Sequence, residues 1–146
     1  MSGLILLLSG PNLNLLGERE PAIYGTTTLD DLVGIATRQA TIHGLRLEHL
    51  QSNTEGVLVD AIHGARGRAD AIIINPGAFT HYAWSLHDAL AAFDGVKVEL
   101  HLSNPNAREP WRHTSVVAPV VAGSIVGFGA LGYRLAVDAI AAKLAA

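Results

Sequence analysis

The chain has 146 residues, the length of a single domain, and 49% of them are hydrophobic while 16% are charged. This composition excludes a disordered chain, and the absence of cysteine excludes a disulfide framework, a thiol nucleophile and cysteine-ligated zinc. A formal net charge of −3 argues against binding to nucleic acid. We expect one domain over residues 1–146 that hides apolar surface under helices or between subunits.

Two apolar stretches require a check for targeting or membrane insertion. Residues 4–8 form an apolar run without a basic flank, which is too short for the core of a signal peptide. Residues 114–133 are uncharged, but they contain Pro119 and several glycines, and their apolar residues occur in short clusters. The sequence therefore predicts a cytoplasmic protein that does not insert into a membrane.

Short apolar runs alternate with segments of helical periodicity along the whole chain. Thr28 with Asp31, and Ser52 with Glu55, have the spacing of capping boxes at the start of the first and second helices. In chain order, the expected elements are a strand at 4–9, a helix at 28–43, a strand at 45–51, a helix from 52, a strand at 71–74, a helix at 83–93, a strand at 96–102, a strand at 123–126 and a helix at 130–144.

These elements predict an α/β fold, with a doubly wound, five-stranded parallel sheet in the flavodoxin-like order 2-1-3-4-5. In such a sheet, ligands bind beyond the carboxyl ends of the strands, near the point where the strand order reverses. That point lies between the first and third strands, with the fourth strand beside them. The segments expected to form a site are residues 10–27, 75–82 and 101–113.

The first of these segments, residues 10–27, is about three times longer than a typical connection from a strand to a helix. Loops of this length in compact domains are typically lids or binding loops, and Gly17 and Gly25 are candidate hinges. A plain surface excursion is the alternative interpretation. A phosphate-binding loop is disfavoured because the segment lacks the G-x-x-x-x-G-K-[ST] pattern.

Alternation along the fourth strand places Lys97, Glu99, His101 and Ser103 on one face. Such a pattern is most often a solvated strand face. At the predicted binding edge, however, a Glu-x-His pair can orient and tune an imidazole, and histidine suits general acid catalysis near neutral pH.

Two other features of this edge allow a functional or a structural interpretation. Asn75-Pro76-Gly77 forms either part of a binding loop or a plain turn. Arg108 and Arg112, four residues apart, are either surface charges or an anion clamp. With His81 and His113 they would make the pocket cationic in an acidic protein, which fits a carboxylate substrate.

The sequence predicts neither a cofactor nor a metal. Gly127-x-Gly129-x-x-Gly132 matches a dinucleotide fingerprint, but too few residues follow for the second strand and the acidic residue that complete it. These glycines indicate close packing of a strand on a helix. The histidines lack the spacing of metal ligands, and the G-x-S-x-G elbow of serine hydrolases is absent.

Four blocks of sequence occur in a characteristic order along nearly the whole chain. They are residues 9–25 (SGPNLNLLGEREPAIYG), 75–81 (NPGAFTH), 99–104 (ELHLSN) and 108–112 (REPWR). Together they closely resemble the type II 3-dehydroquinate dehydratases, a family whose fold is flavodoxin-like.

The resemblance implies a lyase that dehydrates 3-dehydroquinate to 3-dehydroshikimate through an enolate, in the shikimate route to chorismate and the aromatic amino acids. It implies that Tyr24 is the base and that the Arg19 guanidinium makes it competent, because free tyrosine, with a pKa of about 10, is a poor base. By the same resemblance, Asn12 holds a water that stabilises the enolate. His101, oriented by Glu99, protonates the departing hydroxyl.

The resemblance also implies a homo-oligomer, because members of the family form trimers that assemble into dodecamers. Asp88 matches a residue that reaches into the site of a neighbouring subunit. Residues 1–146 are expected to form one catalytic domain. Thr54, Asn106, residues 82–84 and His87 depart from the usual family pattern, and none of them is a presumed catalytic position. The positions that match substrate contacts are Asn75, His81, Asp88, Leu102, Ser103 and Arg112.

Other functions remain as alternatives on the same scaffold. An FMN carrier would need a phosphate-binding first loop, and a receiver-like module would need an aspartate at the end of a strand. A different lyase that handles anions is compatible with the predicted pocket. An imine-forming route is disfavoured, because the only two lysines, Lys97 and Lys143, lie away from the predicted edge.

Overall fold

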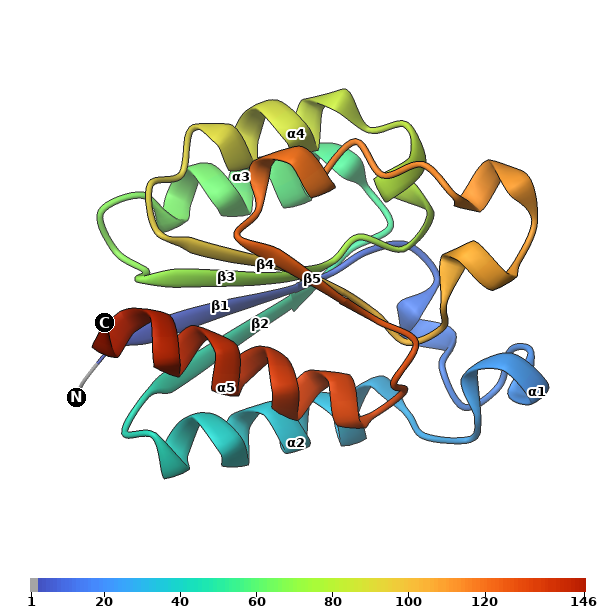
Figure 1. The fold of residues 1–146 in the computed structure, drawn as a ribbon, viewed down its shortest axis with the longest axis horizontal. Helices are drawn as coiled ribbons and strands as arrows, with labels where there is room; N and C mark the ends of the chain where they lie inside the picture. Colours follow the sequence, from blue (N-terminus) through green and yellow to red (C-terminus); the bar gives the residue numbers. More distant parts are fainter. Residues whose placement is uncertain (1–2) are drawn as a thin grey trace.

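A parallel five-stranded sheet forms the centre of the protein, with helices on both of its faces (Figure 1). The structure is a computed structural model that describes residues 3–146, apart from the side chain of Tyr24. The strand order β2-β1-β3-β4-β5 confirms the predicted doubly wound, flavodoxin-like sheet. The strands are β1 Leu4–Ser9, β2 Arg46–Gln51, β3 Ala71–Asn75, β4 Val96–His101 and β5 Gly123–Val126, and the helices are α1 Pro21–Tyr24, α2 Leu29–Ile42, α3 Glu55–Ala65, α4 Trp84–Ala91 and α5 Leu131–Ala145.

Local hydrogen bonds decide where the first long helices begin. At α2 the Asp31 amide donates to the Thr28 hydroxyl at 3.2 Å and the Thr28 amide donates to the Asp31 carboxylate at 3.0 Å, which confirms the predicted capping box. At α3 the predicted start at Ser52 is wrong, because the helix begins at Glu55 with Thr54 as its N-cap. The Ser52 hydroxyl instead accepts a hydrogen bond from the Thr54 amide at 2.9 Å, which closes a local turn before the helix.

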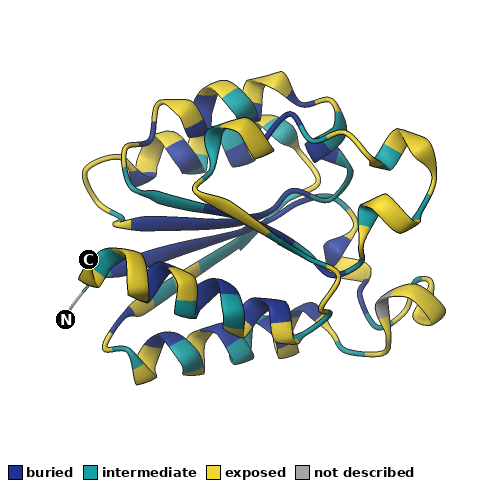
Figure 2. Cartoon of the chain, in the orientation of Figure 1, coloured by how far each residue is buried: buried dark blue, intermediate teal, exposed yellow. Residues whose placement is uncertain are grey.

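The sheet separates two hydrophobic layers. Side chains alternate along β1, so that Ile5 and Leu7 pack under α2 and α5, whereas Leu6 and Leu8 pack under α3 and α4. β1 and β3 are buried at every position, as is usual for central strands of a parallel sheet (Figure 2). Among the described residues, no helix is both long and apolar enough to cross a membrane.

The glycines of the dinucleotide-like pattern allow α5 to pack closely on the sheet. A Cβ atom on Gly132 would lie 2.9 Å from Leu100 Cδ1, so a side chain there would require either the buried Leu100 side chain or the helix to shift. Gly127 and Gly129 have φ angles of 87° and 57°, a left-handed conformation that glycine adopts without strain. They form the turn between β5 and α5.

The carboxyl ends of β1, β3 and β4 meet at one edge of the sheet. Ser9 lies opposite Asn75 across β1 and β3, and Ile74 lies opposite Glu99 across β3 and β4. The connections that leave these strand ends are therefore close together, although they are far apart in the sequence.

Candidate active site

A cavity of about 240 Å³ opens at this edge of the sheet. Its walls come from the connections that follow β1, β3 and β4, which are the segments that the strand order predicted. Eight of the eleven residues that the family resemblance assigns to the site line it, namely Asn12, Arg19, Asn75, His81, His101, Leu102, Ser103 and Arg112.

Positive charge dominates the cavity wall. Arg19, Arg108 and Arg112 line it together with two histidines, and none of its described lining residues is acidic. Glu109 anchors the last two arginines, with Oε2 2.9 Å from Arg112 Nε and Oε1 3.8 Å from Arg108 Nε. The hydrogen bond from Arg112 holds the pKa of Glu109 below its ordinary value. The cavity therefore suits a small anion, in agreement with the clamp interpretation of Arg108 and Arg112.

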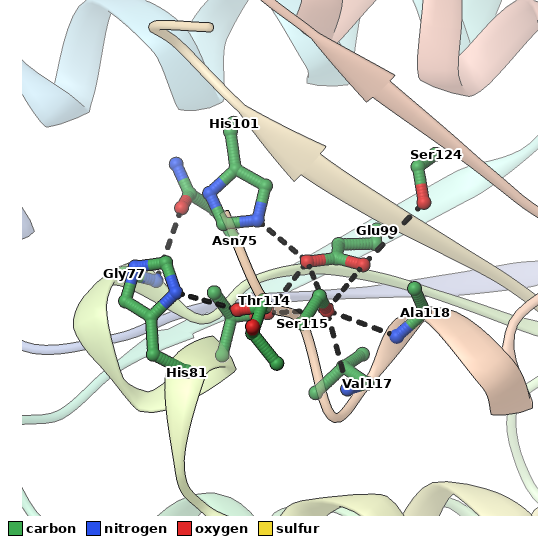
Figure 3. Close-up of polar contacts among 11 residues, drawn as sticks. Asn75, Gly77, His81, Glu99, His101, Thr114, Ser115, Val117, Ala118 and Ser124 are labelled. Atoms are coloured by element: carbon green, nitrogen blue, oxygen red, sulfur yellow. Dashed lines mark hydrogen bonds and ion pairs between the residues drawn. The ribbon is translucent and has the colours of Figure 1, made fainter. Parts of the chain in front are cut away.

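His101 is held by a buried carboxylate at the end of β4. Its Nε2 lies 2.6 Å from Glu99 Oε2, and the exposed fractions of the two side chains are 11% and 3% (Figure 3). Burial by itself raises the pKa of Glu99, but hydrogen bonds from His101, Thr80 and Ser115 outweigh burial and hold that pKa below its ordinary value. Glu99 is therefore ionised at neutral pH and accepts a hydrogen from Nε2, which leaves Nδ1 available to the cavity.

Trp111 organises the outer wall of the cavity. The guanidinium carbon of Arg112 lies 4.0 Å from the centroid of the Trp111 ring, and the His81 ring meets the indole edge-on at 5.2 Å. His81 Nδ1 lies 2.7 Å from the Thr114 carbonyl oxygen. Because a carbonyl oxygen can only accept, His81 Nδ1 carries a hydrogen and its Nε2 is the atom left for a ligand.

Asn75 is fixed at the end of β3 by two hydrogen bonds. Its Oδ1 accepts from the Gly77 amide at 3.3 Å, and its Nδ2 donates to the Tyr133 hydroxyl at 3.2 Å. Tyr133 is completely buried on α5, and burial raises its pKa to about 12. Tyr133 is therefore a neutral phenol at neutral pH that orients Asn75.

The connection after β1 is braced from the neighbouring strand β2. Asn12 has a φ angle of 67°, in the left-handed region, and its amide donates to Asn53 Oδ1 at 3.0 Å. Gln51 Nε2 donates to the Gly10 carbonyl oxygen at 3.1 Å. Gln51 and Asn53 thus hold the backbone that presents Asn12 to the cavity.

The remainder of the first connection is a 3-10 turn and helix α1, where the sequence predicted an irregular loop. Leu13 is buried in the core, whereas the Arg19 side chain is 30% exposed and pairs with the Glu20 carboxylate at 3.2 Å. Tyr24 ends α1, but its side chain lies outside the described part of the structure. Its pairing with Arg19 stays a prediction.

Known proteins share both the sequence and the fold of this chain. Residues 3–141 match the family model described as Dehydroquinase class II. The chain belongs to the class II dehydroquinase family.

A catabolic 3-dehydroquinase from Aspergillus clavatus is 56% identical over 137 residues, which cover 94% of this chain and 91% of that protein. A 3-dehydroquinate dehydratase from Corynebacterium glutamicum is 53% identical over 141 residues, 97% of each chain. The crystal structure of the type II dehydroquinase from Propionibacterium acnes has a TM-score of 0.93 at 44% identity, covering 97% of this chain and 98% of that one.

Asp88 lies away from the cavity of this class II dehydroquinase, on α4. Its side chain is 85% exposed, and its Oδ1 lies 3.1 Å from His87 Nδ1. Asp88 therefore does not take part in the site of its own chain. The role across a subunit contact that the family resemblance implies for Asp88 stays a prediction.

Several residues of this class II dehydroquinase that sequence reasoning missed support the residues that line the cavity. They lie at the rim of the cavity or contact the residues that line it from behind. Most of their contacts join segments that are far apart in the sequence. Thr80 and Trp111 lie inside recognised blocks, and Gln51, Asn53 and Ser115 lie close to the end of a strand or of a block, whereas no signal in the sequence marked Tyr133 on α5. These residues are Gln51, Asn53, Thr80, Trp111, Ser115 and Tyr133.

Proposed function

We propose that this class II dehydroquinase is a lyase that removes water from 3-dehydroquinate through an enolate to give 3-dehydroshikimate, a step in the shikimate pathway. The names of its relatives support the reaction. The observation that carries the mechanism is the buried pair of Glu99 and His101 at the wall of a cationic cavity. The purified protein should convert 3-dehydroquinate to a product with the ultraviolet absorbance of a conjugated enone, and an unchanged spectrum would overturn the proposal.

The substrate carboxylate is expected to bind next to the end of β4. Ser103 and Leu102 both line the cavity, and the Ser103 hydroxyl oxygen accepts a hydrogen bond from Arg108 at 3.3 Å. That contact leaves the hydroxyl hydrogen of Ser103 available to donate to an anion, beside the Leu102 amide. Asn75, His81 and Arg112 then supply contacts to the ring hydroxyls.

Tyr24 is the proposed base. The chain has three tyrosines; Tyr133 is a buried neutral phenol, and Tyr82 is 59% exposed and does not line the cavity. Tyr24 shares the first connection with Arg19, which does line the cavity. A nearby guanidinium favours a phenolate, so Tyr24 takes the proton from the carbon beside the ketone.

The enolate and the leaving group require a donor and an acid. Asn12 lies at the cavity wall, where it is proposed to hold a water that donates to the enolate oxygen. His101 begins the step with both nitrogens protonated and gives its Nδ1 proton to the departing hydroxyl, which leaves as water. Glu99 keeps the hydrogen on Nε2. Tyr24 has then gained one proton and His101 has lost one, and exchange with solvent restores both.

Neither lysine supports an imine route. Lys97 Nζ donates to the carbonyl oxygens of Leu90 and Phe93 at 2.8 and 2.6 Å, which secures the end of α4. Lys143 lies on α5 beside a separate apolar cavity of about 330 Å³. Borohydride added with the substrate should leave the activity intact, and covalent trapping on either lysine would overturn the enolate route.

The role of His101 has a direct kinetic test. His101→Ala should lower kcat by about 10²–10⁴, the usual contribution of general acid catalysis, while substrate binding changes less. His63→Ala, an exposed histidine on α3, is the matched control and should leave kcat unchanged. An increase in KM with unchanged kcat would mean that His101 only binds the substrate.

The proposal extends to the assembly, as trimers that form a dodecamer in which Asp88 of one chain approaches the cavity of another. The exposed position of Asp88, beside the exposed aromatic residues Tyr82 and Trp84, supports a subunit contact on this surface. Light scattering should report a multiple of three chains, and an active monomer would overturn this arrangement. The cytoplasmic location expected from the sequence stays a prediction.

A further inference from the structure

Hydroxyl groups surround the buried carboxylate of Glu99 on the sides that His101 does not cover (Figure 3). Thr80 Oγ1 lies 2.6 Å from Oε2, and Ser115 Oγ lies 3.0 and 2.9 Å from Oε1 and Oε2. Ser124 Oγ is more distant, at 3.4 Å from Oε1. These hydroxyls come from the connection after β3, the segment before β5, and β5 itself.

Two backbone amides fix the direction of the hydrogen bonds in this cluster. The amides of Val117 and Ala118 both donate to Ser115 Oγ, at 3.2 and 3.0 Å, and together they occupy its two lone pairs. Thr80 Oγ1, 2.8 Å from Ser115 Oγ, therefore cannot donate to it and must send its hydrogen to Glu99. The Ser115 hydrogen in turn points to Glu99 directly or through Thr80.

This polarity disfavours a protonated Glu99. The competing arrangement places the shared hydrogen on Glu99, which would then donate it to His101 Nε2. In that state Thr80 and Ser115 would donate to a neutral acid, whereas in the proposed state they donate to a carboxylate. A hydrogen bond to an ionised acceptor is about twice as strong as one to a neutral acceptor, so the two donated hydrogen bonds favour the carboxylate form of Glu99. With Glu99 restricted to accepting, the nitrogen of His101 that faces it must carry a hydrogen.

We propose that Ser115 is a positioning residue for the acid: its hydroxyl, oriented by the amides of Val117 and Ala118, keeps Glu99 as an acceptor and so holds the hydrogen of the Glu99–His101 pair on Nε2. Nδ1 is then the nitrogen that exchanges a proton with the substrate, in every turnover. The proposal rests on the proposed function for the role of His101 as the acid. The tautomer itself does not depend on that function.

The first measurement needs no substrate. In protein labelled with ¹⁵N-histidine, magic-angle-spinning nuclear magnetic resonance distinguishes protonated from bare ring nitrogens, and His101→Ala assigns the signal by its loss. At a pH where His101 is neutral, we expect a protonated Nε2 and a bare Nδ1 in the wild type. A mixture of tautomers, or a hydrogen on Nδ1 alone, would overturn the proposal.

The second measurement separates positioning from a structural role. Ser115→Ala should lower kcat about 10-fold to 100-fold, the size of one hydrogen bond to a charged group, and change KM by about twofold or less. It should also move part of the hydrogen from Nε2 to Glu99, seen as a shift of the Nε2 signal towards that of a bare nitrogen. Ser115→Thr keeps the hydroxyl and should restore both kcat and the signal.

Ser124→Ala is the matched control, because it removes a more distant serine hydroxyl from the same carboxylate and leaves Ser115 in place. It should lower kcat less than Ser115→Ala and leave the Nε2 signal of His101 unchanged. A Ser115→Ala variant with wild-type kcat would overturn the proposal. So would a slow variant with unchanged nitrogen signals, since Ser115 would then only support the fold of its turn.

Failure of the proposed function gives a different result. A wild-type protein that does not dehydrate 3-dehydroquinate would overturn that function, whereas the nitrogen signals would still decide the role of Ser115. If Ser115→Ala does not fold, Ser115→Cys replaces the hydroxyl with a weaker donor of similar size and should move kcat and the Nε2 signal in the same direction, so that unchanged values would overturn the proposal.

Discussion

The two sides of the cavity differ in how their proposed catalytic groups are held. On the side of β4, His101 and Glu99 are almost completely buried, and hydroxyls from two other segments hold the carboxylate. On the side of the first connection, Arg19 is partly exposed, and most residues of α1 lie on the surface (Figure 2). The beginning of this connection is anchored in the core by Leu13 and Leu16, whereas its other described hydrophobic side chains are not buried.

This difference indicates that the proposed acid is positioned before the substrate binds, whereas the proposed base depends on the position of a surface segment. A buried, hydrogen-bonded imidazole does not have to reorganise during the reaction. The described side chains between residues 17 and 25 are exposed or only partly buried, so the substrate can supply contacts that complete the arrangement of this segment. Substitutions on the two sides should therefore have different kinetic signatures.

The largest expected effect tests the exposed side. Tyr24→Phe removes the titrating oxygen and keeps the ring, so it should lower kcat by about 10⁴, near the upper limit for general base catalysis, with little loss of stability. Turnover in the enone assay measures this effect. The control is Tyr82→Phe, an exposed tyrosine away from the cavity, which should keep wild-type turnover. An active Tyr24→Phe variant would place the base elsewhere.

A smaller effect is expected when the base is kept and its charged neighbour is removed. Arg19→Ala should lower kcat/KM about 100-fold at neutral pH. It should also shift the acidic limb of the pH–rate profile to higher pH by about one unit or more, because a phenol without a nearby cation ionises at higher pH. Arg38→Ala, an exposed arginine on α2, is the control. An unshifted acidic limb would contradict the coupling of Arg19 to the base.

On the buried side, Tyr133→Phe removes the acceptor for Asn75 Nδ2. We expect KM to rise about 10-fold and kcat to change less, because Asn75 is proposed to bind the substrate and takes no part in proton transfer. Steady-state kinetics measure both quantities. If kcat fell and KM stayed constant, Asn75 would act in the transition state and its assignment as a binding residue would be wrong.

The smallest effect concerns the point where the exposed segment meets helix α2. Thr28→Ala breaks the capping box and should lower the free energy of unfolding by about 1 kcal/mol, or the melting temperature by about 3 °C, with kcat unchanged. Thermal denaturation measures the change. Thr37→Ala in the same helix is the control, because its hydroxyl bonds to the Val33 carbonyl within the helix, and it should cost less. A large loss of kcat in Thr28→Ala would show that this cap also positions the catalytic segment.

The sequence by itself determined the strands, their order and the edge of the sheet where the cavity lies. Hydrophobic periodicity encodes the strands and helices, because it records locally which face of each element is buried. The alternation of five strands with helices favours this strand order, and the strand order in turn locates the edge. The pairing of Glu99 with His101 was also predictable, since alternation places residues two apart on the same face of a strand. The start of α3 was not, because Ser52 and Thr54 both offer capping hydroxyls and local turn geometry decides between them.

The tertiary structure alone decided which distant residues hold the proposed catalytic and binding groups. Ser115 donates to Glu99 over a sequence separation of 16 residues, and Gln51 donates to Gly10 over a separation of 41. Tyr133 accepts from Asn75 over a separation of 58 residues. No periodicity in the sequence reports such contacts, because each one depends on how a helix or connection packs against the end of a strand that it does not follow. Periodicity places a side chain on a face, and only the packing of the complete chain brings a hydrogen-bond partner within about 3 Å of it.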